Sequence, residues 1–384
     1  MRARLRKLIL LIRIYWIVTQ GNETVNQKNS YIVYHRNDAG DLGIIARCKM
    51  MKLLTVLFIA VLLCGCQKSV EEQLVKLGYT KEESELIMNL EEADQNRFLD
   101  HRDEKMTKYL LMENFKAEKL DDYLKYDGLL ADEKVVELVN EGIINDSNAE
   151  LLKEMYDSEY FIEAKEKLYL QYLDRYDDLR KLLEFVNTKR YMSLYTDVRI
   201  TDVSKDVKML VNKYYRLPAD YEPDDLVPVE AALGRGYLRK EVYEAYKKLY
   251  EDSLKEGFNL KIVSAYRSYA TQQSLYNGYL KVDPKEVVDT YSARPGHSEH
   301  QTGLCMDVSE PGYSLDNFYQ TKASKWLAAN CYKYGFIIRY PEDKTDITGY
   351  QGEPWQLRYV GMDTAKDVYR RGITYDEYYA CFVE

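Results

Sequence analysis

A few polar side chains near the C-terminus have the types and spacing that hydrolytic chemistry needs. His300 and Asp307 supply a nitrogen and an oxygen ligand, at a spacing that a loop followed by a strand can bring together. Zinc binds such ligands at about 2.0–2.2 Å, and a catalytic zinc site combines three protein ligands with a water. Glu353 could deprotonate that water, and Arg267 could neutralise an oxyanion. A single His–Asp couple is also common as a surface pair, so these residues alone leave both interpretations open.

The elements that must position these residues are short strands and helices. The predicted strands lie at residues 260–268, about 304–308, 336–340 and 355–360, with helices at 269–280 and 326–334. Gly335 is expected to end the second helix. Strands and helices alternate loosely over about 170 residues, which favours one α+β domain. The polar residues fall at the ends of the predicted strands.

Composition limits the class of protein. The 384 residues are 46% hydrophobic, too many for a disordered chain, and carry a net charge of −9. Residues 1–65 contain 10 Lys/Arg and 3 Asp/Glu, which leaves 44 against 60, or −16, for the remainder. A body this acidic is unsuited to a phosphate backbone, so no nucleic-acid partner is expected. The four histidines and six cysteines exclude a histidine-rich metal cluster and a dense disulfide scaffold.

Residues 51–65 have the pattern of a lipoprotein-type signal peptide. Met51-Lys52 is followed by the eleven-residue apolar run LLTVLFIAVLL, too short for a membrane-spanning helix. Leu63-Cys64-Gly65-Cys66 resembles a bacterial lipobox, whose last cysteine is lipidated. We expect a mature chain that begins at Cys66, anchored to the outer face of the cell membrane. An ordinary signal peptide or a membrane anchor is the alternative.

Residues 1–50 precede what reads as a complete signal. We interpret them as an over-extended start, with translation beginning at Met50 or Met51. The alternative is a genuine N-terminal membrane segment at residues 8–18, which are apolar but interrupted by Arg13.

Residues 66–204 are predicted to form an acidic, all-helical arm. Proline is absent there, and Thr80-x-x-Glu83 has the form of a capping box at a helix start. Tyr123 and the tetrad ending at Asn140 are echoed by Tyr172 and the tetrad ending at Asn187, 47 residues later, which suggests repeated helical hairpins. The favoured interpretation is a spacer that lifts the C-terminal domain off the membrane, and the alternative is an arm that binds a protein partner.

The polar clusters together resemble the VanY-type zinc D-alanyl-D-alanine carboxypeptidases of the cell wall. Their signature is S-x-H-x-x-G-x-A-x-D, followed downstream by E-x-W-H. The matching residues are Ser298, His300, Gly303 and Asp307 in the first motif, and Glu353 and Trp355 in the second. SAYRS, ARPG, Gly335-Phe336 and RYVG also match. The resemblance covers residues 205–384 and implies a compact, mixed sheet-and-helix domain of the α+β class.

The resemblance also implies roles for individual residues. His300 and Asp307 would bind zinc, Glu353 would act as general base, and Arg267 would steady the tetrahedral intermediate. The expected substrate-binding residues are Ser298, Arg294 and Gln272. The substrate would be the stem peptide of peptidoglycan, which loses its C-terminal D-alanine.

This chain departs from the family at the third zinc ligand, where Gln356 replaces histidine. A neutral carboxamide is outside the usual zinc ligand set. Cys305, two residues before Asp307 on the same face of a strand, could compensate, or could be a small buried residue at the alanine position of the motif. His297, at a variable position of the motif, is expected to be structural or to lie at the rim of the site, and not to bind the metal. Cys331 and Cys381 could pair as a disulfide or stay reduced.

Two functions follow from these features. The first is a zinc carboxypeptidase with weakened metal binding, which is favoured because Glu353 and Arg267 are retained. The second is an inactive relative that still binds peptidoglycan, which the loss of a ligand at Gln356 favours.

The lipobox interpretation predicts that Cys66→Ala releases the protein from the membrane fraction, because the substitution removes the acylated side chain. Fractionation of cells expressing either form, followed by immunoblotting, checks this. A Cys66→Ala protein that stays membrane-bound would contradict the lipid anchor and favour an anchor at residues 8–18.

Overall fold

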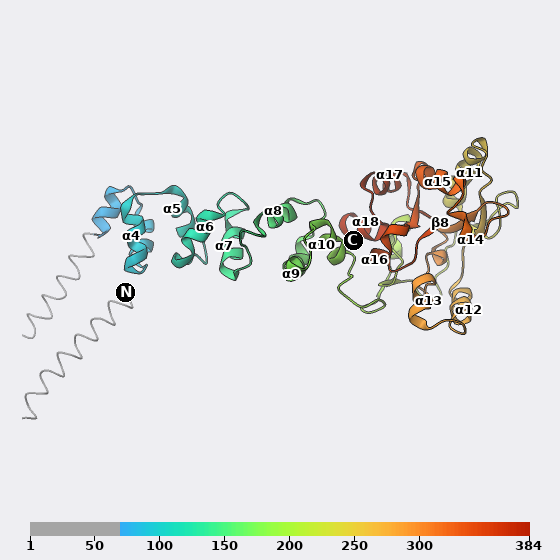
Figure 1. The fold of residues 1–384 in the computed structure, drawn as a ribbon, viewed down its shortest axis with the longest axis horizontal. Coiled ribbons are helices and arrows are strands. Elements are labelled where there is room, and N and C mark those ends of the chain that lie inside the picture. The colour runs from blue at the N-terminus through green and yellow to red at the C-terminus, as the bar shows by residue number, and fades with distance from the viewer. Residues whose placement is uncertain (1–69) are drawn as a thin grey trace, which may run out of the picture. The chain divides into compact units, whose positions relative to one another are not determined.

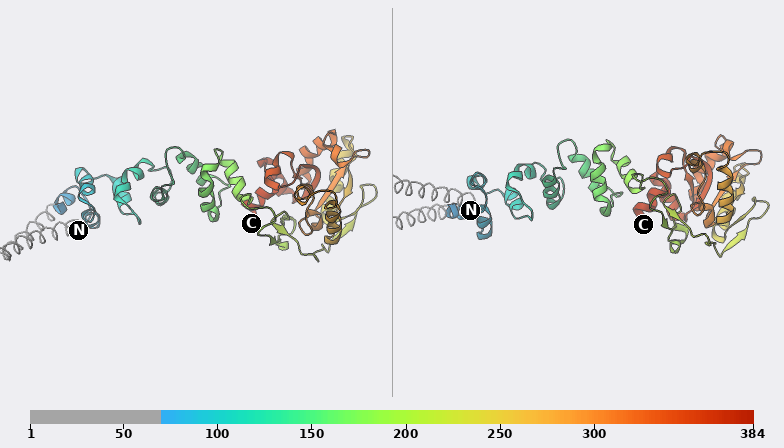
Figure 2. Two further views of the ribbon diagram at one scale, coloured as in Figure 1. Left: turned by 60° about the horizontal axis from the view of Figure 1, so that its bottom comes forward. Right: turned by 90° about the horizontal axis from the view of Figure 1, so that it is seen from below.

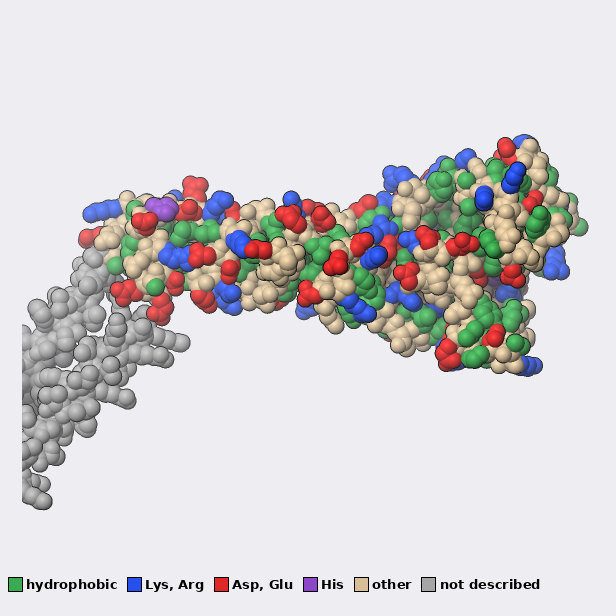
Figure 3. Space-filling view, in the orientation of Figure 1, with side chains coloured by type: hydrophobic (Ala, Val, Ile, Leu, Met, Phe, Trp, Pro, Cys, Tyr) green, Lys and Arg blue, Asp and Glu red, His purple; other side chains and the backbone are tan. Residues whose placement is uncertain are grey.

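The computed structural model describes residues 70–384 (Figure 1). The predicted leader, signal peptide and lipidated Cys66 lie outside the described residues. The chain divides into two compact units, Met1–Lys153 and Glu154–Glu384. No helix in the described part of the chain is long and apolar enough to cross a membrane. Acidic side chains are interspersed with lysines and arginines on the face drawn in Figure 3.

The first unit is helical, as predicted. Residues 70–76 form a helix, followed by α3 Lys81–Met88 and α4 Glu92–Asp100. The predicted capping box is present: the Glu83 N–H donates to the Thr80 hydroxyl, and the Thr80 N–H donates to the Glu83 carboxylate at 2.7 Å. Both bonds satisfy backbone groups that a helix start leaves without partners.

Two copies of a three-helix module follow. Module 1 (residues 104–142) contains α5 Glu104–Leu110, α6 Leu120–Lys125 and α7 Asp132–Glu141. Module 2 (residues 149–188) contains α8 Ala149–Asp157, α9 Glu166–Tyr172 and α10 Leu179–Asn187. A short 3-10 turn precedes each middle helix, η1 Ala117–Lys119 and η2 Glu163–Lys165.

Hydrogen bonds of one tyrosine and one asparagine, called here the Tyr–Asn lock, hold module 1 together. The Tyr123 hydroxyl accepts a hydrogen bond from the Lys116 N–H at 3.2 Å and donates one to Asn140 Oδ1 at 2.6 Å. The Asn140 amide donates to the carbonyl of Asn114 at 2.9 Å. These bonds join the loop before η1 to both following helices.

Module 2 repeats the lock with Tyr169 and Asn187. Tyr169 accepts from the Ile162 N–H at 3.2 Å and donates to Asn187, whose amide donates to the carbonyl of Tyr160 at 2.8 Å. The internal repeat is therefore present in the fold. Tyr123 corresponds to Tyr169 and not to Tyr172, because the stretch from the tyrosine to the asparagine is one residue longer in module 2.

The C-terminal unit has the predicted α+β architecture. Its strands are β1 Arg199–Ile200, β2 Tyr215–Arg216, β3 Leu226–Pro228, β4 Tyr237–Arg239, β5 Lys261–Ser264, β6 Cys305–Ser309, β7 Phe336–Tyr340 and β8 Glu353–Tyr359. Besides α9 and α10 of module 2, its helices are α11 Lys240–Lys255, α12 Tyr269–Tyr279, α13 Lys285–Tyr291, α14 Leu315–Phe318, α15 Lys322–Asn330, α16 Thr345–Thr348, α17 Met362–Arg371 and α18 Tyr375–Phe382.

An antiparallel four-stranded sheet in the order β5-β6-β8-β7 carries the polar clusters. Met306 and Val308 of β6 point into the main apolar core, together with residues of α11 and α15. Since side chains alternate along a strand, Cys305 and Asp307 point to the opposite face. The sheet therefore buries one face and presents the other to the site.

Most predicted elements are confirmed, with different ends. β7 matches its predicted range, and Gly335 ends the preceding helical turn in the left-handed conformation, φ 85°. The strand predicted at 260–268 ends at Ser264, because Ser268 caps α12 through its hydroxyl and the residues between form a loop. β8 begins at Glu353, two residues earlier than predicted.

Module 2 packs against the C-terminal helices of the same unit (Figure 2). Arg180 donates to Glu377 at 2.9 Å, and Arg371 pairs with Glu159 at 2.6 Å. The following linker adds β1, which pairs in parallel with β2. Residues 154–204 of the predicted arm therefore belong structurally with the C-terminal unit.

We expect a fragment of residues 154–384 to unfold at a higher temperature than one of residues 205–384. The shorter fragment loses β1 and both ion pairs, and a loss of about 3 kcal/mol lowers Tm by about 6–12 °C in a domain of this size. Thermal unfolding followed by circular dichroism measures the difference. Equal midpoints would show that residues 154–204 contribute nothing to the unit.

Candidate active site

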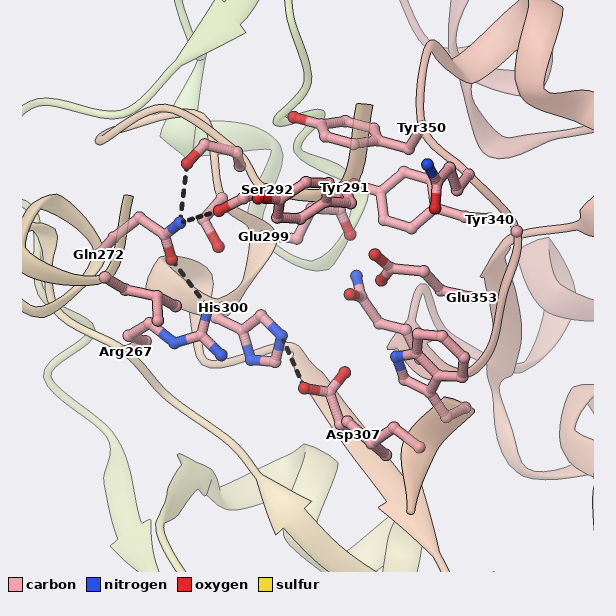
Figure 4. Close-up of a pocket in the computed structure, with 18 of the residues that line it drawn as sticks. Arg267, Gln272, Tyr291, Ser292, Glu299, His300, Asp307, Tyr340, Tyr350 and Glu353 are labelled. Carbon is pink, nitrogen blue, oxygen red and sulfur yellow. Dashed lines mark hydrogen bonds and ion pairs between the residues drawn. The ribbon is translucent and has the colours of Figure 1, made fainter. Parts of the chain in front are cut away.

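The predicted polar residues converge on a cavity of about 540 Å³ on the polar face of the sheet (Figure 4). The predicted site residues that line it are Arg267, Gln272, Ser298, His300, Asp307, Glu353 and Gln356. Tyr279, Tyr291, Tyr340, Tyr350 and Trp355 form aromatic walls. Three segments distant in sequence thus meet in one place.

His300 and Asp307 face each other at the cavity. His300 Nδ1 lies 2.7 Å from the carbonyl oxygen of Ala265, which can only accept, so Nδ1 carries a proton. Nε2 lies 3.4 Å from Asp307 Oδ2. In the neutral tautomer, a lone pair on Nε2 points at a carboxylate. A proton or a cation between the two groups would relieve this arrangement.

Asp307 has a second oxygen without a partner. Its Oδ1 is buried and makes no hydrogen bond. Buried oxygens are normally satisfied, so this atom fits a role as a metal ligand. His300 and Asp307 therefore match what zinc requires of two ligands, including a backbone carbonyl that orients the imidazole.

Gln356, at the position where the resemblance implies the third ligand, also lies at the cavity. It pairs with Asp307 in the antiparallel register of β6 and β8, and its side chain lines the cavity. Its amide offers a neutral oxygen, which suits zinc poorly. The donor set therefore fits zinc at two positions and not at the third. No group of three His, Cys, Asp or Glu residues in the described part of the chain could hold a metal.

Cys305 is fully buried and does not line the cavity. Burial holds the pKa of its thiol well above the ordinary value. A protonated thiol away from the cavity supports the alternative of a small buried residue. Cys331 and Cys381 are free thiols in the structure.

Glu353 reaches the cavity from the start of β8. The register between β7 and β8 shifts here: Ile338 pairs with Leu357, but Tyr340 pairs with Glu353. β8 thus holds extra residues around Pro354, and this irregularity lets both Glu353 and Gln356 line the cavity.

The environment of Glu353 suits a proton acceptor. Its side chain keeps some exposure to the cavity, but burial of the carboxyl and the nearby Asp307 carboxylate raise its pKa to about 8. Arg267, Arg339 and Lys213 act in the opposite direction. A base with a pKa near the working pH is effective in proton transfer.

Arg267 is held rigidly beside His300. Its backbone N–H donates to the carbonyl of His300 at 3.1 Å. Its guanidinium donates to Gln272 at 2.8 Å and to Ser264 at 2.9 Å. Gln272 in turn donates to the carbonyl of Ala293 at 2.7 Å. This chain of bonds fixes a cation at the cavity wall, where it can meet a developing negative charge.

Arg294, predicted to bind substrate, and His297 do not line the cavity. Arg294 forms a two-point pair with Asp289 at 2.7 and 3.1 Å, stacks on the Tyr195 ring and does not line the cavity. His297 lies 2.7 Å from the carbonyl of Asn212, and burial lowers the pKa of its imidazole to about 4. Its neutral, buried ring agrees with the expected structural role.

The family model for D-alanyl-D-alanine carboxypeptidases of the VanY type matches residues 235–362. The chain is 33% identical over 175 residues to the "Bifunctional D-Ala-D-Ala dipeptidase and D-Ala-D-Ala carboxypeptidase VanXYC" of Enterococcus gallinarum, covering 44% of this chain and 92% of that protein. The chain belongs to this family.

Other relatives match the same domain. The "Putative carboxypeptidase YodJ" of Bacillus subtilis (strain 168) is 43% identical over 184 residues, which cover 46% of this chain and 67% of that protein. Among solved structures, the LdcB LD-carboxypeptidase is 41% identical, with a TM-score of 0.45, over 48% of this chain and 90% of that chain. The chain spans 64% of the length of a D-alanyl-D-alanine carboxypeptidase of Enterococcus faecalis (strain ATCC 700802 / V583).

The VanY-family domain contains a buried ionic cluster that sequence reasoning missed. Glu299 lies between Ser298 and His300 and pairs with Arg339 at 2.6 Å and Arg358 at 3.0 Å. Arg339 also pairs with Asp376 at 2.6 Å. The signal was available at Arg339, which interrupts the apolar and aromatic residues of β7, because a buried charge requires a partner.

We expect Glu353 to make the stability of the metal-free protein depend on pH. Its pKa is raised in the folded state, so its contribution is complete below about pH 4.5 and is lost as the pH rises through about 8. Glu353→Gln keeps a neutral group there. The Tm of the wild type in chelator should therefore fall more steeply between these pH values than that of Glu353→Gln.

Thermal unfolding across that range tests the expectation, with Glu244→Gln on the exposed face of α11 as the matched control. Parallel curves for wild type and Glu353→Gln would show that Glu353 is ionised in the folded state at neutral pH.

Proposed function

We propose that this protein is a cell-envelope zinc metallopeptidase that removes the C-terminal D-alanine from peptidoglycan stem peptides, with metal binding weakened by Gln356. The observation that carries the proposal is the single cavity that holds Glu353, Arg267 and the facing His300–Asp307 pair. The named activities of the relatives support the substrate class.

The side chains of the cavity can carry the proton transfers of peptide hydrolysis. Glu353 would accept a proton from the attacking water and donate it to the departing D-alanine amine. Arg267 would stabilise negative charge on the scissile carbonyl oxygen, while Gln272 and Ser298 position the peptide. Zinc held by His300 and Asp307 would supply Lewis acidity and a water of lowered pKa.

The position of the protein in the cell is part of the proposal. A lipid on Cys66 would hold the chain on the outer face of the membrane, where stem peptides are found. The support is the lipobox in the sequence.

A second candidate function is binding of stem peptides without hydrolysis. Gln356 is the observation that favours it, because the loss of one ligand lowers metal occupancy and leaves the rest of the cavity in place. The two candidates differ in D-alanine release and agree in peptide binding.

We expect Gln356→His to raise zinc affinity by at least about tenfold, the lower end of what changes around a metal site produce. The register already places residue 356 opposite Asp307, so an imidazole there needs no rebuilding of the strands. D-Alanine release from a D-Ala-D-Ala stem peptide should rise in parallel. Zinc titration and D-alanine release are measured on both proteins.

The double variant Glu353→Gln with Gln356→His is the matched control. It should keep the gain in zinc affinity and lose the gain in hydrolysis, because only the base is removed. Cys305→Ala tests whether the Cys305 thiol contributes to zinc binding. If no variant binds zinc or releases D-alanine but the wild type binds the stem peptide, the second candidate is correct. If the folded wild type binds no stem peptide, with or without zinc, both candidates are wrong.

A further inference from the structure

The two modules of the helical region differ in what covers one equivalent face. This face consists of the loop before the middle helix and the outer side of the last helix. The matched positions in modules 1 and 2 are Glu113 and Glu159, Asn114 and Tyr160, Glu133 and Arg180, Glu137 and Glu184, and Asn140 and Asn187. The two modules make equivalent hydrogen bonds through their tyrosine and asparagine, and these bonds establish which positions correspond.

In module 2 this face is an interface with α17 and α18. Glu159 pairs with Arg371, and Arg180 pairs with Glu377. The Tyr160 ring packs on Phe382 at 5.9 Å, and the Asn187 amide donates to Cys381 at 3.4 Å. The module therefore already binds a helix in this chain, through two ion pairs and an aromatic contact.

In module 1 the same face is an open groove of about 740 Å³. Its lining residues are Leu111, Met112, Glu113, Asn114, Lys116, Glu133, Val136, Glu137, Asn140 and Glu141. Leu111 is 50% exposed, and Asn140 is half-buried where its counterpart Asn187 is only 3% exposed. Asn114 is also smaller than Tyr160, so the groove has room for a large apolar side chain.

The negative charge of the groove favours a positively charged ligand. Glu133 stands where module 2 has Arg180, and Glu141 stands where module 2 has Thr188. The groove thus has four carboxylates around Lys116, and one of them, Glu137, is already paired with Lys134 at 2.5 Å. An acidic helix such as α18 would bring Glu377 against Glu133, so a second copy of this chain is disfavoured as the occupant. A cationic helix would pair with the other three carboxylates.

We propose that the groove of module 1 is a docking site for a short cationic amphipathic helix of another protein. Its ligand carries an arginine or lysine opposite Glu133 and a bulky apolar residue over Asn114. Helix-in-groove recognition of this kind uses an apolar face for affinity and flanking charges for specificity. This interaction is independent of the peptidase cavity.

The test is a charge-swap cycle with the full chain and two labelled, stapled peptides that span residues 370–384. One peptide has the native sequence, and the other carries Glu377→Arg. Wild-type protein should bind the Glu377→Arg peptide at least about fivefold more tightly than the native peptide. The Glu133→Arg protein should show the opposite preference. Fluorescence anisotropy in reducing buffer gives the four dissociation constants.

Glu118→Arg is the matched control, because Glu118 is exposed in module 1 but does not line the groove. It should leave the preference for the Glu377→Arg peptide intact. In the full chain α18 covers the equivalent face of module 2, and Glu133→Arg leaves that face unchanged, so a change of preference between wild type and Glu133→Arg reports on module 1. The proposal is wrong if the wild type binds neither peptide at 1 mM, prefers the native peptide, or responds to Glu118→Arg as it does to Glu133→Arg.

Discussion

The site depends on the buried carboxylate of Glu299. This side chain has no exposure, and two arginines from neighbouring strands, Arg339 of β7 and Arg358 of β8, point their guanidinium groups at it. Removing one member of such a group leaves an uncompensated charge in the interior, which costs about 3–5 kcal/mol. The loop that carries Ser298 and His300 is thereby fixed to the two strands. Asp376 extends the cluster to α18, so the end of the chain is tied to the same point.

Strands and motif residues were predictable from the sequence, because both depend on local patterns. FIIRY is apolar or aromatic at every position except Arg339, so β7 could be placed before the structure was known, and the spacing from His300 to Asp307 indicated a loop entering a strand. What the sequence left open depends on contacts between distant segments. Arg294 is directed to Asp289 and Tyr195 by tertiary packing, and the irregular β8 is visible only in its register with β7. The aromatic walls of the cavity gave no periodic signal.

The two modules share the hydrogen bonds of the Tyr–Asn lock but differ in the residues on their outer face. In module 1 the Tyr–Asn pair provides hydrogen-bond partners for two backbone groups at the loop, the Lys116 N–H and the Asn114 carbonyl. Because these bonds hold the loop from inside, the residues outside it are free to vary. At two matched positions of this face, module 2 has Arg180 and Tyr160, whereas module 1 has Glu133 and Asn114. The echo in the sequence therefore persists at both glutamates and at the asparagine of this face, and is lost where Asn114 matches Tyr160 and Glu133 matches Arg180.

Gln356 changes the chemistry of the site and leaves its geometry in place. The amide occupies the same register position opposite Asp307 that a histidine would, so the strands need no adjustment. The resemblance implies a histidine at this position, so an amide would stand in place of a nitrogen donor. His300 Nε2 and Asp307 Oδ2 lie 3.4 Å apart, and the second oxygen of Asp307 makes no hydrogen bond. A proton on His300 or a cation between the two groups would satisfy both. Their placement comes from the loop and β6 and not from residue 356, so the proposed function expects Gln356 to weaken metal binding and not to abolish it.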